Sequence, residues 1–590
     1  MILQELCRLY ERMEADPECM VPLFGWTAEK VEWELVIDER GDVQAVIPLA
    51  IGDGKAARRY QKLLVPEHAG RTSGVKPYFA CDNAKYLLGL DEKRGGKYLA
   101  AERAFHEEVL DGCDDPGARA LLAFFSNDDR ASGLSDGERE ALKSSGLIAF
   151  RLIGDEVWLH ERPAIAGAWD RYRASHSDSE ASGFDSVTGE YGPLARLFPL
   201  VSGVPGAQSS GASLVSYNFD ATESYGKQQA NNASLSERSA FAAGAALKQL
   251  LGDGSHRFIL GDTIVVFWSD SPQPTPVEDD LMFSMLTCAP KAEDEKTLQL
   301  IATSLGNMRA GKPIDPSFNT EVGYFVLGIS PNAARLAVRF FEQNTLSVYV
   351  EHFAQYLQDI EIDGVEPVSL NRLLLQVASQ GKRENVPKTL IRPCFAAMLE
   401  GTPFPASLEQ VILARMAADK ALNNRWDMGQ RAALLKACLL RKNRARLGDA
   451  SGREELTVSL NRNSTNVGYL LGRLFAVMER AQIAAVDPTS TIRDRYMGTA
   501  AVAPAGVFPT LQRGYEVHIA TLRRKDEKRW IVRMLEEEYA DVSAKLPDEK
   551  PFPKLLKQDD RACFYIAFHL ESDYLWKSKA ERETLKKADD

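Results

Sequence analysis

Two patterns of hydrophobic and polar positions occur along the chain, and the first 350 residues combine both. VEWELVID and VQAVIPLA alternate apolar and polar residues around the polar turn 39–42, which predicts a β-hairpin. Two more hairpins are expected, one turning at Gly154–Asp155 in LIAFRLIGDEVWLH and one at Gly261–Asp262 in HRFILGDTIVVFW. Further strands are expected near 324–342, and helices at 2–13, 236–251 and 296–308. Together these elements predict an α+β region with mixed or antiparallel sheets.

Helical periodicity alone governs the rest of the chain. From Val467 onward, apolar residues follow the i, i+3, i+4, i+7 spacing of an amphipathic helix, and the polar residues 464–466 precede it as N-cap candidates. A polar, proline-containing interval, 487–509, is expected to separate this helix from the last ones. We therefore predict an α+β region over residues 1–350, followed by an all-α C-terminal helical bundle over residues 351–590.

The composition is typical of a soluble globular protein, with 45% hydrophobic and 26% charged residues in a chain of 590. No run of about 18 apolar residues is available to span a bilayer. The first residues, MILQELCRLYERMEAD, carry too many charges for the apolar core of a signal peptide. The eight cysteines are dispersed and form no C-x-x-C pair, which is typical of a reducing cytoplasm. We expect a cytoplasmic protein without a membrane span.

Candidate catalytic chemistry is weakly represented. The eight histidines show no paired metal-ligand spacing, and no serine lies in a G-x-S-x-G motif. The spacing Gly206-x-x-x-x-Gly211 approaches that of a phosphate-binding P-loop, but Ala212-Ser213 stands where lysine followed by Ser or Thr is required. We predict no catalytic residue, no metal site and no cofactor. A nucleotide-dependent or hydrolytic enzyme is the disfavoured alternative.

The charge balance restricts how the chain can meet nucleic acid. A net charge of −12 argues against a free-standing protein that binds nucleic acid without sequence preference. Local surfaces can still bind it, especially if other subunits carry most of the polymer. Three segments have side chains suited to that task.

The first segment is the polar loop VPGAQSSGASLVSYN, residues 204–218, followed closely by ESYGKQQANN. Glycine lets a backbone approach a ligand closely, while Ser, Asn and Gln supply neutral donors and acceptors that suit base edges and phosphate oxygens. A structural turn, with glycines at positive φ and serines as caps, is the alternative. The DNA-binding candidates are Gln208, Ser209, Ser210, Asn218 and Lys227.

The second segment, RTSGVKPYFACDNAKYLLGL, covers residues 71–90 and interleaves basic with aromatic residues. Such residues bind phosphates and stack on exposed bases. A solvated loop that buries its aromatics, Tyr78 and Phe79, is the alternative. The candidates for contact with DNA beside the first segment are Arg71, Thr72, Ser73, Lys76 and Asn83.

The third segment runs from Arg425 to Arg446 and contains seven Lys and Arg residues against a single acid, Asp427. On a helix, Arg441 and Arg444 share one face, as do Lys442 and Arg446. Such a cluster can follow a nucleic-acid backbone without sequence preference. The candidates are Arg441, Lys442, Arg444 and Arg446.

The first two segments also carry a family resemblance. RTSGVKPYFACDNAKYLLGL and GVPGAQSSGASLVSYNFDATESYGKQQANNASLSERSAF resemble the signature blocks of the large subunit of the type I-C CRISPR surveillance complex, Cascade. MILQELCRLYERM, DTIVVFW and GYFVLGISPNAARLAVRFF resemble the same family in the same order. The similarity spans most of the chain.

The resemblance implies a non-enzymatic, RNA-guided role in prokaryotic antiviral defence. The guide RNA would pair with the target, while this subunit would recognise the short protospacer-adjacent motif in duplex DNA, help to open the duplex and help to present the DNA to a helicase-nuclease. The implied partners, besides target DNA, are the backbone, guide-processing and small subunits of the complex that holds the CRISPR RNA.

The three segments would then divide the work. We expect the 204–218 group to approach the base edges of the motif, and the 71–83 group to hold flanking phosphates or share that recognition. The basic cluster at 441–446 would guide the displaced non-target strand of the R-loop. Residues from about 467 to 590 resemble the small subunit. A purely structural scaffold, whose loops bind nothing, is the alternative.

Overall fold

The protein is seen in a computed structural model that describes residues 1–16, 19, 21–50, 60–68, 74–91, 93–143, 146–176, 181–217, 219–292, 294–418, 425–447 and 456–589. It forms two compact units. The N-terminal unit comprises Met1–Gly203 and Gln208–Gln249, and the C-terminal unit comprises Val204–Ala207 and Leu250–Asp590. Each unit is described separately below.

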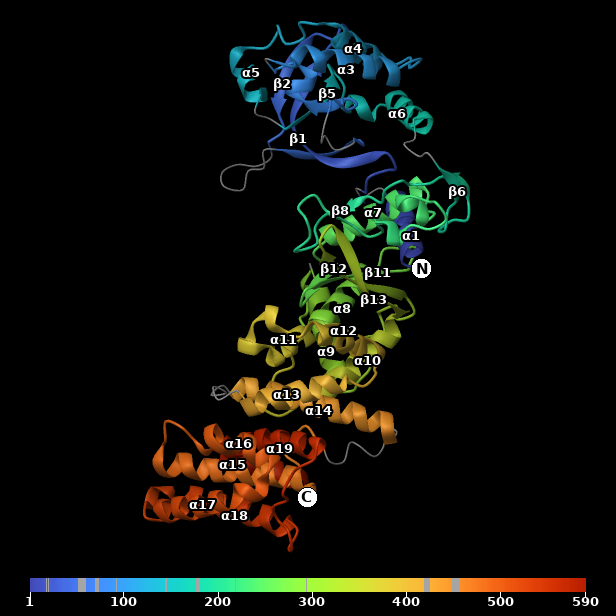
Figure 1. Ribbon diagram of the computed structural model, residues 1–590. Helices are drawn as coiled ribbons and strands as arrows, with labels where there is room; N and C mark the ends of the chain where they lie inside the picture. Colours follow the sequence, from blue (N-terminus) through green and yellow to red (C-terminus); the bar gives the residue numbers. More distant parts are fainter. Residues whose placement is uncertain are drawn as a thin grey trace. The chain divides into compact units, whose positions relative to one another are not determined.

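A mixed sheet organises the first part of the N-terminal unit (Figure 1). Strand β1 (Trp26–Ile37) pairs antiparallel with β2 (Val43–Pro48) and β3 (Gln61–Pro66), and parallel with β5 (Leu147–Leu152). Strand β4 (Cys81–Asn83) pairs antiparallel with β5. The accompanying helices are α2 (Ala84–Leu87), α3 (Gly95–Val109), α4 (Pro116–Ser126), α5 (Asp136–Lys143) and α6 (Pro163–Ser175). The hairpin at 39–42 and the mixed sheet are as the sequence predicts.

The hairpin predicted at Gly154–Asp155 is wrong. After β5 ends, the chain forms the 3-10 helix η2 (Leu159–Glu161) instead of a second strand. Strand β1 pairs along the length of β5 on one side, and β4 pairs with Leu147–Ala149 on the other, so a following strand could not pair along the whole of β5. The chain is held elsewhere, because Arg162 beyond η2 forms an ion pair with Asp115, the N-cap of α4, at 2.8 Å.

The second part of the N-terminal unit joins the two ends of its sequence. Helix α1 (Ile2–Ala15) lies against α7 (Glu237–Gly252), with the Tyr10 and Phe241 rings edge to face at 5.9 Å. Two short antiparallel pairs precede α7: β6 (Ser182–Phe184) with β7 (Tyr191–Pro193), and β8 (Leu200–Val201) with β9 (Ala212–Ser213). The 3-10 turns η3 (Asp220–Thr222) and η4 (Gln229–Asn232) follow.

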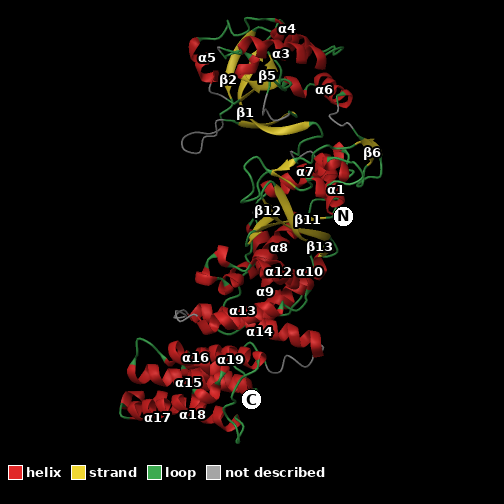
Figure 2. Ribbon diagram, viewed as in Figure 1, coloured by secondary structure: helices red, strands yellow, loops and turns green. Residues whose placement is uncertain are grey.

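The C-terminal unit begins with an antiparallel sheet and continues as helices alone (Figure 2). The sheet contains β10 (Arg257–Leu260), β11 (Thr263–Ser269), β12 (Gly323–Asn332) and β13 (Arg335–Thr345), and it confirms the predicted hairpin at 261–262. Helices α8 (Pro276–Thr287) and α9 (Glu295–Arg309) lie between β11 and β12. The predicted change near residue 350 therefore marks the end of the strands, and it falls inside this unit.

The helices after β13 confirm the all-α region. They are α10 (Leu346–Ile360), α11 (Leu370–Leu374), η5 (Leu375–Val377), η6 (Ser379–Gly381), η7 (Arg383–Asn385), α12 (Lys388–Glu400), α13 (Ala406–Ala418), α14 (Arg425–Leu447), α15 (Val467–Val486), α16 (Ile492–Val502), η8 (Pro504–Gly506), α17 (Phe508–Arg523), η9 (Asp526–Lys528), α18 (Arg529–Lys545), α19 (Gln558–Trp576) and α20 (Lys579–Asp589). The interval 487–509 is less irregular than predicted, because Thr491 and Asp494 form a capping box that starts α16.

Helix α15 is the centre of the last bundle. Its predicted N-cap is confirmed: the Asn466 side chain accepts a hydrogen bond from the Tyr469 amide at 2.9 Å. A Cβ atom added at Gly468 would lie 2.0 Å from the Asp560 carbonyl oxygen, and one at Gly472 would lie 2.1 Å from that of Phe564. Glycine at these two positions is what allows α15 and α19 to approach so closely.

Candidate nucleic-acid interface

The tip of the β8–β9 loop presents three polar side chains to solvent. Gln208, Ser209 and Ser210 are exposed, and their side chains make no contact with any other described polar group. Below them the Gly211 amide donates to the Gln208 carbonyl at 2.9 Å, which closes a turn. Gly211 has φ = 97° and would place a Cβ only 3.0 Å from the Val201 carbonyl oxygen, so the turn requires glycine. Asn218, the fourth predicted residue, lies outside the described residues.

This loop does not have the architecture of a P-loop. The residues after Gly211 form strand β9, whereas a P-loop leads directly into a helix whose N-terminus faces the phosphates. The missing lysine was the first reason against nucleotide binding by this loop, and the strand after Gly211 is a second.

The polar block after the β8–β9 loop is tied to its own backbone. The Asn232 side chain accepts from the Ser224 amide at 2.9 Å and donates to the carbonyl oxygens of Lys227 and Gln229, each at 3.0 Å. The predicted DNA contact Lys227 is exposed, and its Nζ donates to Ser234 Oγ at 3.4 Å. Asparagine thus fixes the protein loop here, and the neighbouring lysine extends into solvent.

The second segment, residues 71–90, is called the flanking loop below. Its described part presents the Lys76 side chain to solvent, and its Asn83 side chain caps a helix. Lys76 is exposed, and its backbone amide donates to the Tyr86 hydroxyl at 3.3 Å. Asn83 Oδ1 accepts from the Lys85 amide at 3.1 Å and starts α2, so this oxygen already has a structural partner. Arg71, Thr72 and Ser73 lie outside the described residues.

Two aromatic residues of this loop differ, because Phe79 is buried and Tyr78 is half-buried. Phe79 is 2% exposed and stacks on Trp169 at a ring-centroid distance of 5.4 Å, while Tyr78 stacks on His68 at 3.8 Å. For Phe79, the structure therefore supports the alternative in which the aromatic ring is buried rather than stacked on a base. A ring enclosed by core residues has no free face for a nucleobase.

Two buried polar groups hold the flanking loop from below. The Asp82 carboxylate, fully buried, accepts from the Tyr78 amide at 2.9 Å. His106 Nε2 accepts from the Ala80 amide at 3.0 Å, and Ala80 has the unusual φ of 52°. Burial lowers the pKa of His106 to about 3, so the imidazole is neutral and able to accept this bond. The loop conformation is thus fixed by the protein.

A basic surface beside this loop was missed in the sequence. We define the basic corner as Lys76, Lys85, Lys93, Arg94 and Lys97, all of which are exposed. The Tyr86 and Tyr98 rings stack at 4.3 Å and join α2 to the first turn of α3, which brings the segments that carry these cations together. The acid nearest to Lys93 and Arg94 in the described sequence, Asp91, accepts from the Arg94 and Lys93 amides at 2.8 and 3.0 Å, and these bonds lower its pKa. A local charge count extended past Leu90 would have found this surface.

The predicted surface on α14 is wrong for two of its four residues. Arg441 is 1% exposed, pairs with Asp359 at 2.8 Å and donates to the Ala397 carbonyl at 2.6 Å. Arg444 pairs with the same carboxylate at 2.6 Å. They do share a face of the helix, as predicted, but that face lies against α10. Arg441 is therefore enclosed in the protein, and half-buried Arg444 is held by the same carboxylate, so neither is presented as a free cation to a DNA backbone.

The other two α14 candidates differ from each other. Lys442 forms an ion pair with Asp559 and lies 3.7 Å from Glu409. Arg446 is exposed and is the one candidate of the four without an ion pair to any described residue. Lys436, one helical turn before the group, is also buried, and burial lowers its pKa to about 8. Most of the basic residues described on α14 are thus paired with acids or buried against neighbouring helices.

A family comparison covers nearly the whole chain. A family model described as CRISPR-associated protein (Cas_Csd1) matches residues 6–575. The chain belongs to the Cas_Csd1 family. A search of curated proteins found no match. Membership confirms the predicted CRISPR association, and the matched range includes the β8–β9 loop, the basic corner and α14.

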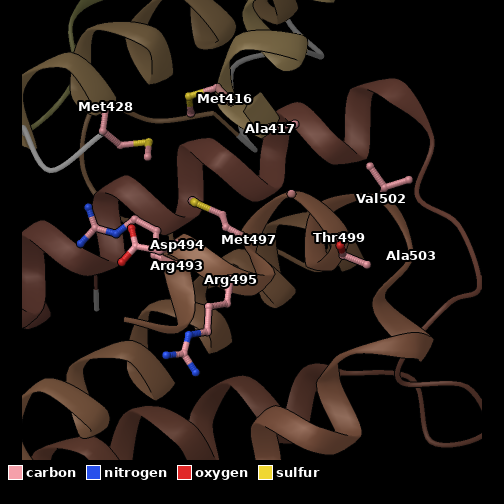
Figure 3. Close-up of a pocket in the computed structure, with 11 residues that line it drawn as sticks. Met416, Ala417, Met428, Arg493, Asp494, Arg495, Met497, Thr499, Val502 and Ala503 are labelled. Atoms are coloured by element: carbon pink, nitrogen blue, oxygen red, sulfur yellow. The ribbon is translucent and has the colours of Figure 1, made fainter. Parts of the chain in front are cut away.

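Two observations concern metal and small-ligand binding in the described part of this Cas_Csd1 chain. No group of three or more His, Cys, Asp or Glu side chains there is arranged to hold a metal ion. A cavity of about 430 Å³ in the C-terminal unit is lined by Met416, Met428 and Met497 (Figure 3). Two polar side chains of its lining are engaged, because Arg493 pairs with Glu479 at 2.8 Å and Asp494 caps α16.

No helix in the described part of the chain is both long enough and apolar enough to cross a bilayer.

Proposed function

We propose that this Cas_Csd1 chain is the large subunit of a type I-C Cascade complex. In this role it recognises the protospacer-adjacent motif in duplex DNA, helps to open the duplex and hold the displaced strand, and helps to present the DNA to a helicase-nuclease. It performs no catalysis itself. Family membership supports a CRISPR complex as the setting, and the N-terminal unit supports DNA as the ligand.

The observation that carries the proposal is the pairing of two surface types in the N-terminal unit. The β8–β9 loop offers the neutral side chains Gln208, Ser209 and Ser210, which suit the donors and acceptors of base edges. The basic corner offers exposed cations, which suit phosphates and fix a protein on the duplex. A protein that recognises a short motif needs both kinds of contact.

Loop rigidity supports the same role. Among the described residues, eight non-glycine residues have positive φ, and three of them lie in the two predicted DNA-binding segments: Ala80, Tyr225 and Gln229. Backbone strain of this kind is concentrated at functional sites, where the surrounding structure maintains it. Asp82, His106 and Asn232 supply that support here.

The net charge fits a subunit better than a free-standing DNA-binding protein. At −12, the whole chain repels nucleic acid, so the basic corner acts only where the complex already holds the polymer. The partners in this proposal are the backbone, guide-processing and small subunits with the CRISPR RNA, the target duplex and the helicase-nuclease. The segment from about residue 467 to 590 would resemble the small subunit.

The decisive experiment compares guide-RNA complexes assembled with and without this chain. Binding to targets with an intact or a scrambled flanking motif would be measured at one salt concentration. Motif-dependent affinity that appears only with the chain supports the proposal. Equal affinity in every case favours the second candidate, a purely structural scaffold.

The loop is tested by replacing Gln208 with alanine, and by a double replacement of Ser209 and Ser210, after assembly has been verified. We expect motif preference to fall by about tenfold for each lost base contact. Gln273→Ala, which truncates an exposed glutamine of the C-terminal unit, is the matched control. Unchanged preference in the Gln208 variant would remove that residue from the motif contact.

A further inference from the structure

Tyr225 is the most exposed of the large hydrophobic side chains that the structure describes in the N-terminal unit. Its exposed fraction is 100%, so its ring packs against nothing. Tyr225 and Gly226 have φ values of 55° and 71°, and the Lys227 amide donates to the Ser224 carbonyl at 3.0 Å. These features define a tight turn with left-handed conformations at both central positions. Asn-Gly and Asp-Gly are the usual sequences there, and a bulky residue is an outlier.

The turn is held rigidly in spite of this strain. Asn232 Oδ1 accepts from the first residue of the turn, Ser224, at 2.9 Å, and Asn232 Nδ2 donates to the last, Lys227, at 3.0 Å. Next to the turn, the Gln229 amide donates to Glu223 Oε1 at 3.1 Å, which engages the nearest acid. One amide side chain therefore fixes both ends of the turn, and Tyr225 is presented from a preorganised support.

The strain and the exposure together point to an external contact. A tyrosine in a left-handed conformation is less stable than asparagine or glycine would be, and here no packing within the protein compensates for the difference. Strained residues that persist in a well-supported loop are associated with ligand contact. The ring gains nothing within the protein, so its benefit must come from a partner.

We propose that Tyr225 stacks on an unpaired base of the target DNA, while Lys227 contacts an adjacent phosphate. The inference rests on the proposed function and specifies one contact within it. A neutral aromatic ring stacks on any base, because every base has a π face. Lys227, two residues away and exposed, supplies the charge that a nucleic-acid strand requires and that an uncharged protein surface does not.

The test uses the assembled guide-RNA complex and two DNA probes. One probe carries a short unpaired bubble beside the flanking motif, and the other is fully paired; 2-aminopurine in the bubble reports base stacking by its fluorescence. The variants are Tyr225→Asn, which removes the ring and tolerates the left-handed conformation, and Tyr225→Phe, which keeps the ring. Gln380→Gly is the matched control, because Gln380 is exposed in the C-terminal unit with φ = 60°.

We expect the Asn variant to melt at the same or a higher temperature than the wild type. Its affinity for the bubble probe should fall about tenfold, the scale of one stacked base, with loss of 2-aminopurine quenching. The Phe variant should retain affinity and quenching, and the Gln380 variant should match the wild type.

Three results would overturn the inference. Wild-type affinity and quenching in the Asn variant would exclude a stacked base. A Phe variant as weak as the Asn variant would assign the contact to the hydroxyl group. An Asn variant that folds but no longer joins the complex would identify a protein subunit as the partner. If the wild type shows motif-dependent binding, each of these results rejects the Tyr225 contact alone; without such dependence, the proposed function falls as well.

Discussion

Two groups of basic residues that each lie close together in the sequence differ in their exposure to solvent. Lys93, Arg94 and Lys97 at the start of α3 are exposed, with no ion pair to any described residue. Arg441 and Arg444 near the end of α14 lie against α10 and share the carboxylate of Asp359. Both groups are clusters of basic residues in the sequence, but their surroundings in the structure differ. A basic run therefore indicates a nucleic-acid surface only when the element that carries it has a free face.

The largest expected effect is on the buried group. Arg441→Ala should lower the free energy of unfolding by about 3 kcal/mol, because it leaves Asp359 buried with one cation fewer. Chemical denaturation of the purified chain measures this. Arg446→Ala, on the same helix but exposed, should change stability by less than about 0.5 kcal/mol. Equal stability of the two variants would contradict the burial of Arg441.

The opposite behaviour is expected of the exposed group. Changing Lys93, Arg94 and Lys97 to glutamate should leave the melting temperature nearly unchanged. In the assembled complex, the slope of log affinity against log salt should become less steep by about 2–3, since up to three phosphate contacts are lost. DNA binding titrated at several salt concentrations measures the slope.

A triple change of equal charge provides the control for that experiment. Arg523, Arg529 and Arg533 in the last helices are also exposed, but each pairs with an acid, the partners being Glu536, Asp526 and Glu537. Their replacement by glutamate should leave the salt slope unchanged. Equal slopes for both triple variants would remove the basic corner from the DNA contact.

The buried support of the flanking loop should respond to pH. The pKa of His106 is about 3 in the folded protein against an ordinary value of 6.5, so the unfolded chain binds a proton more readily. The stability associated with the neutral imidazole is therefore present above pH 6.5 and is lost as pH falls toward 3, with a slope of about 1.4 kcal/mol per pH unit. His106→Gln, which keeps an acceptor for the Ala80 amide, should remove that part of the slope in unfolding measurements across this range.

The smallest effect is expected for the exposed end of α14. Arg446→Glu should change R-loop formation by the assembled complex less than about twofold, because a single exposed charge contributes little and its predicted companions are occupied inside the protein. Gel-shift measurement of R-loop formation tests this. A large loss would restore the prediction that α14 guides the displaced strand.

The sequence predicts helices and strands well where a hydrophobic pattern repeats over many residues. It predicts poorly which residues distant in the sequence will contact each other. The helical stripe of α15 and its cap at Asn466 are correct because both signals are local. Asp359 lies 82 residues before Arg441, so no local pattern reveals that this carboxylate encloses the α14 arginines. The failed hairpin after β5 has the same origin, since it depends on the pairing of β5 with β1 and β4, which are distant in sequence.

In the candidate site, the type of a residue predicted whether its side chain is exposed better than it predicted whether that side chain binds a ligand or the protein itself. Gln208, Ser209 and Ser210 are exposed as expected from a polar turn with glycines. The asparagines are different, because an Asn side chain can satisfy its own backbone as readily as a ligand: Asn83 caps a helix and Asn232 fixes a turn. The strained conformation of Tyr225 has no sequence signature, since it depends on those backbone contacts.

The placement of Asp359 has a consequence for how the C-terminal unit loses its structure. Helix α10, which carries this residue, begins at Leu346, directly after β13 ends at Thr345. The two arginines of α14 therefore hold a helix that is continuous with the sheet. Sheet and helices should come apart in a single cooperative transition, and hydrogen exchange should find β13, α10 and α14 within one protected unit.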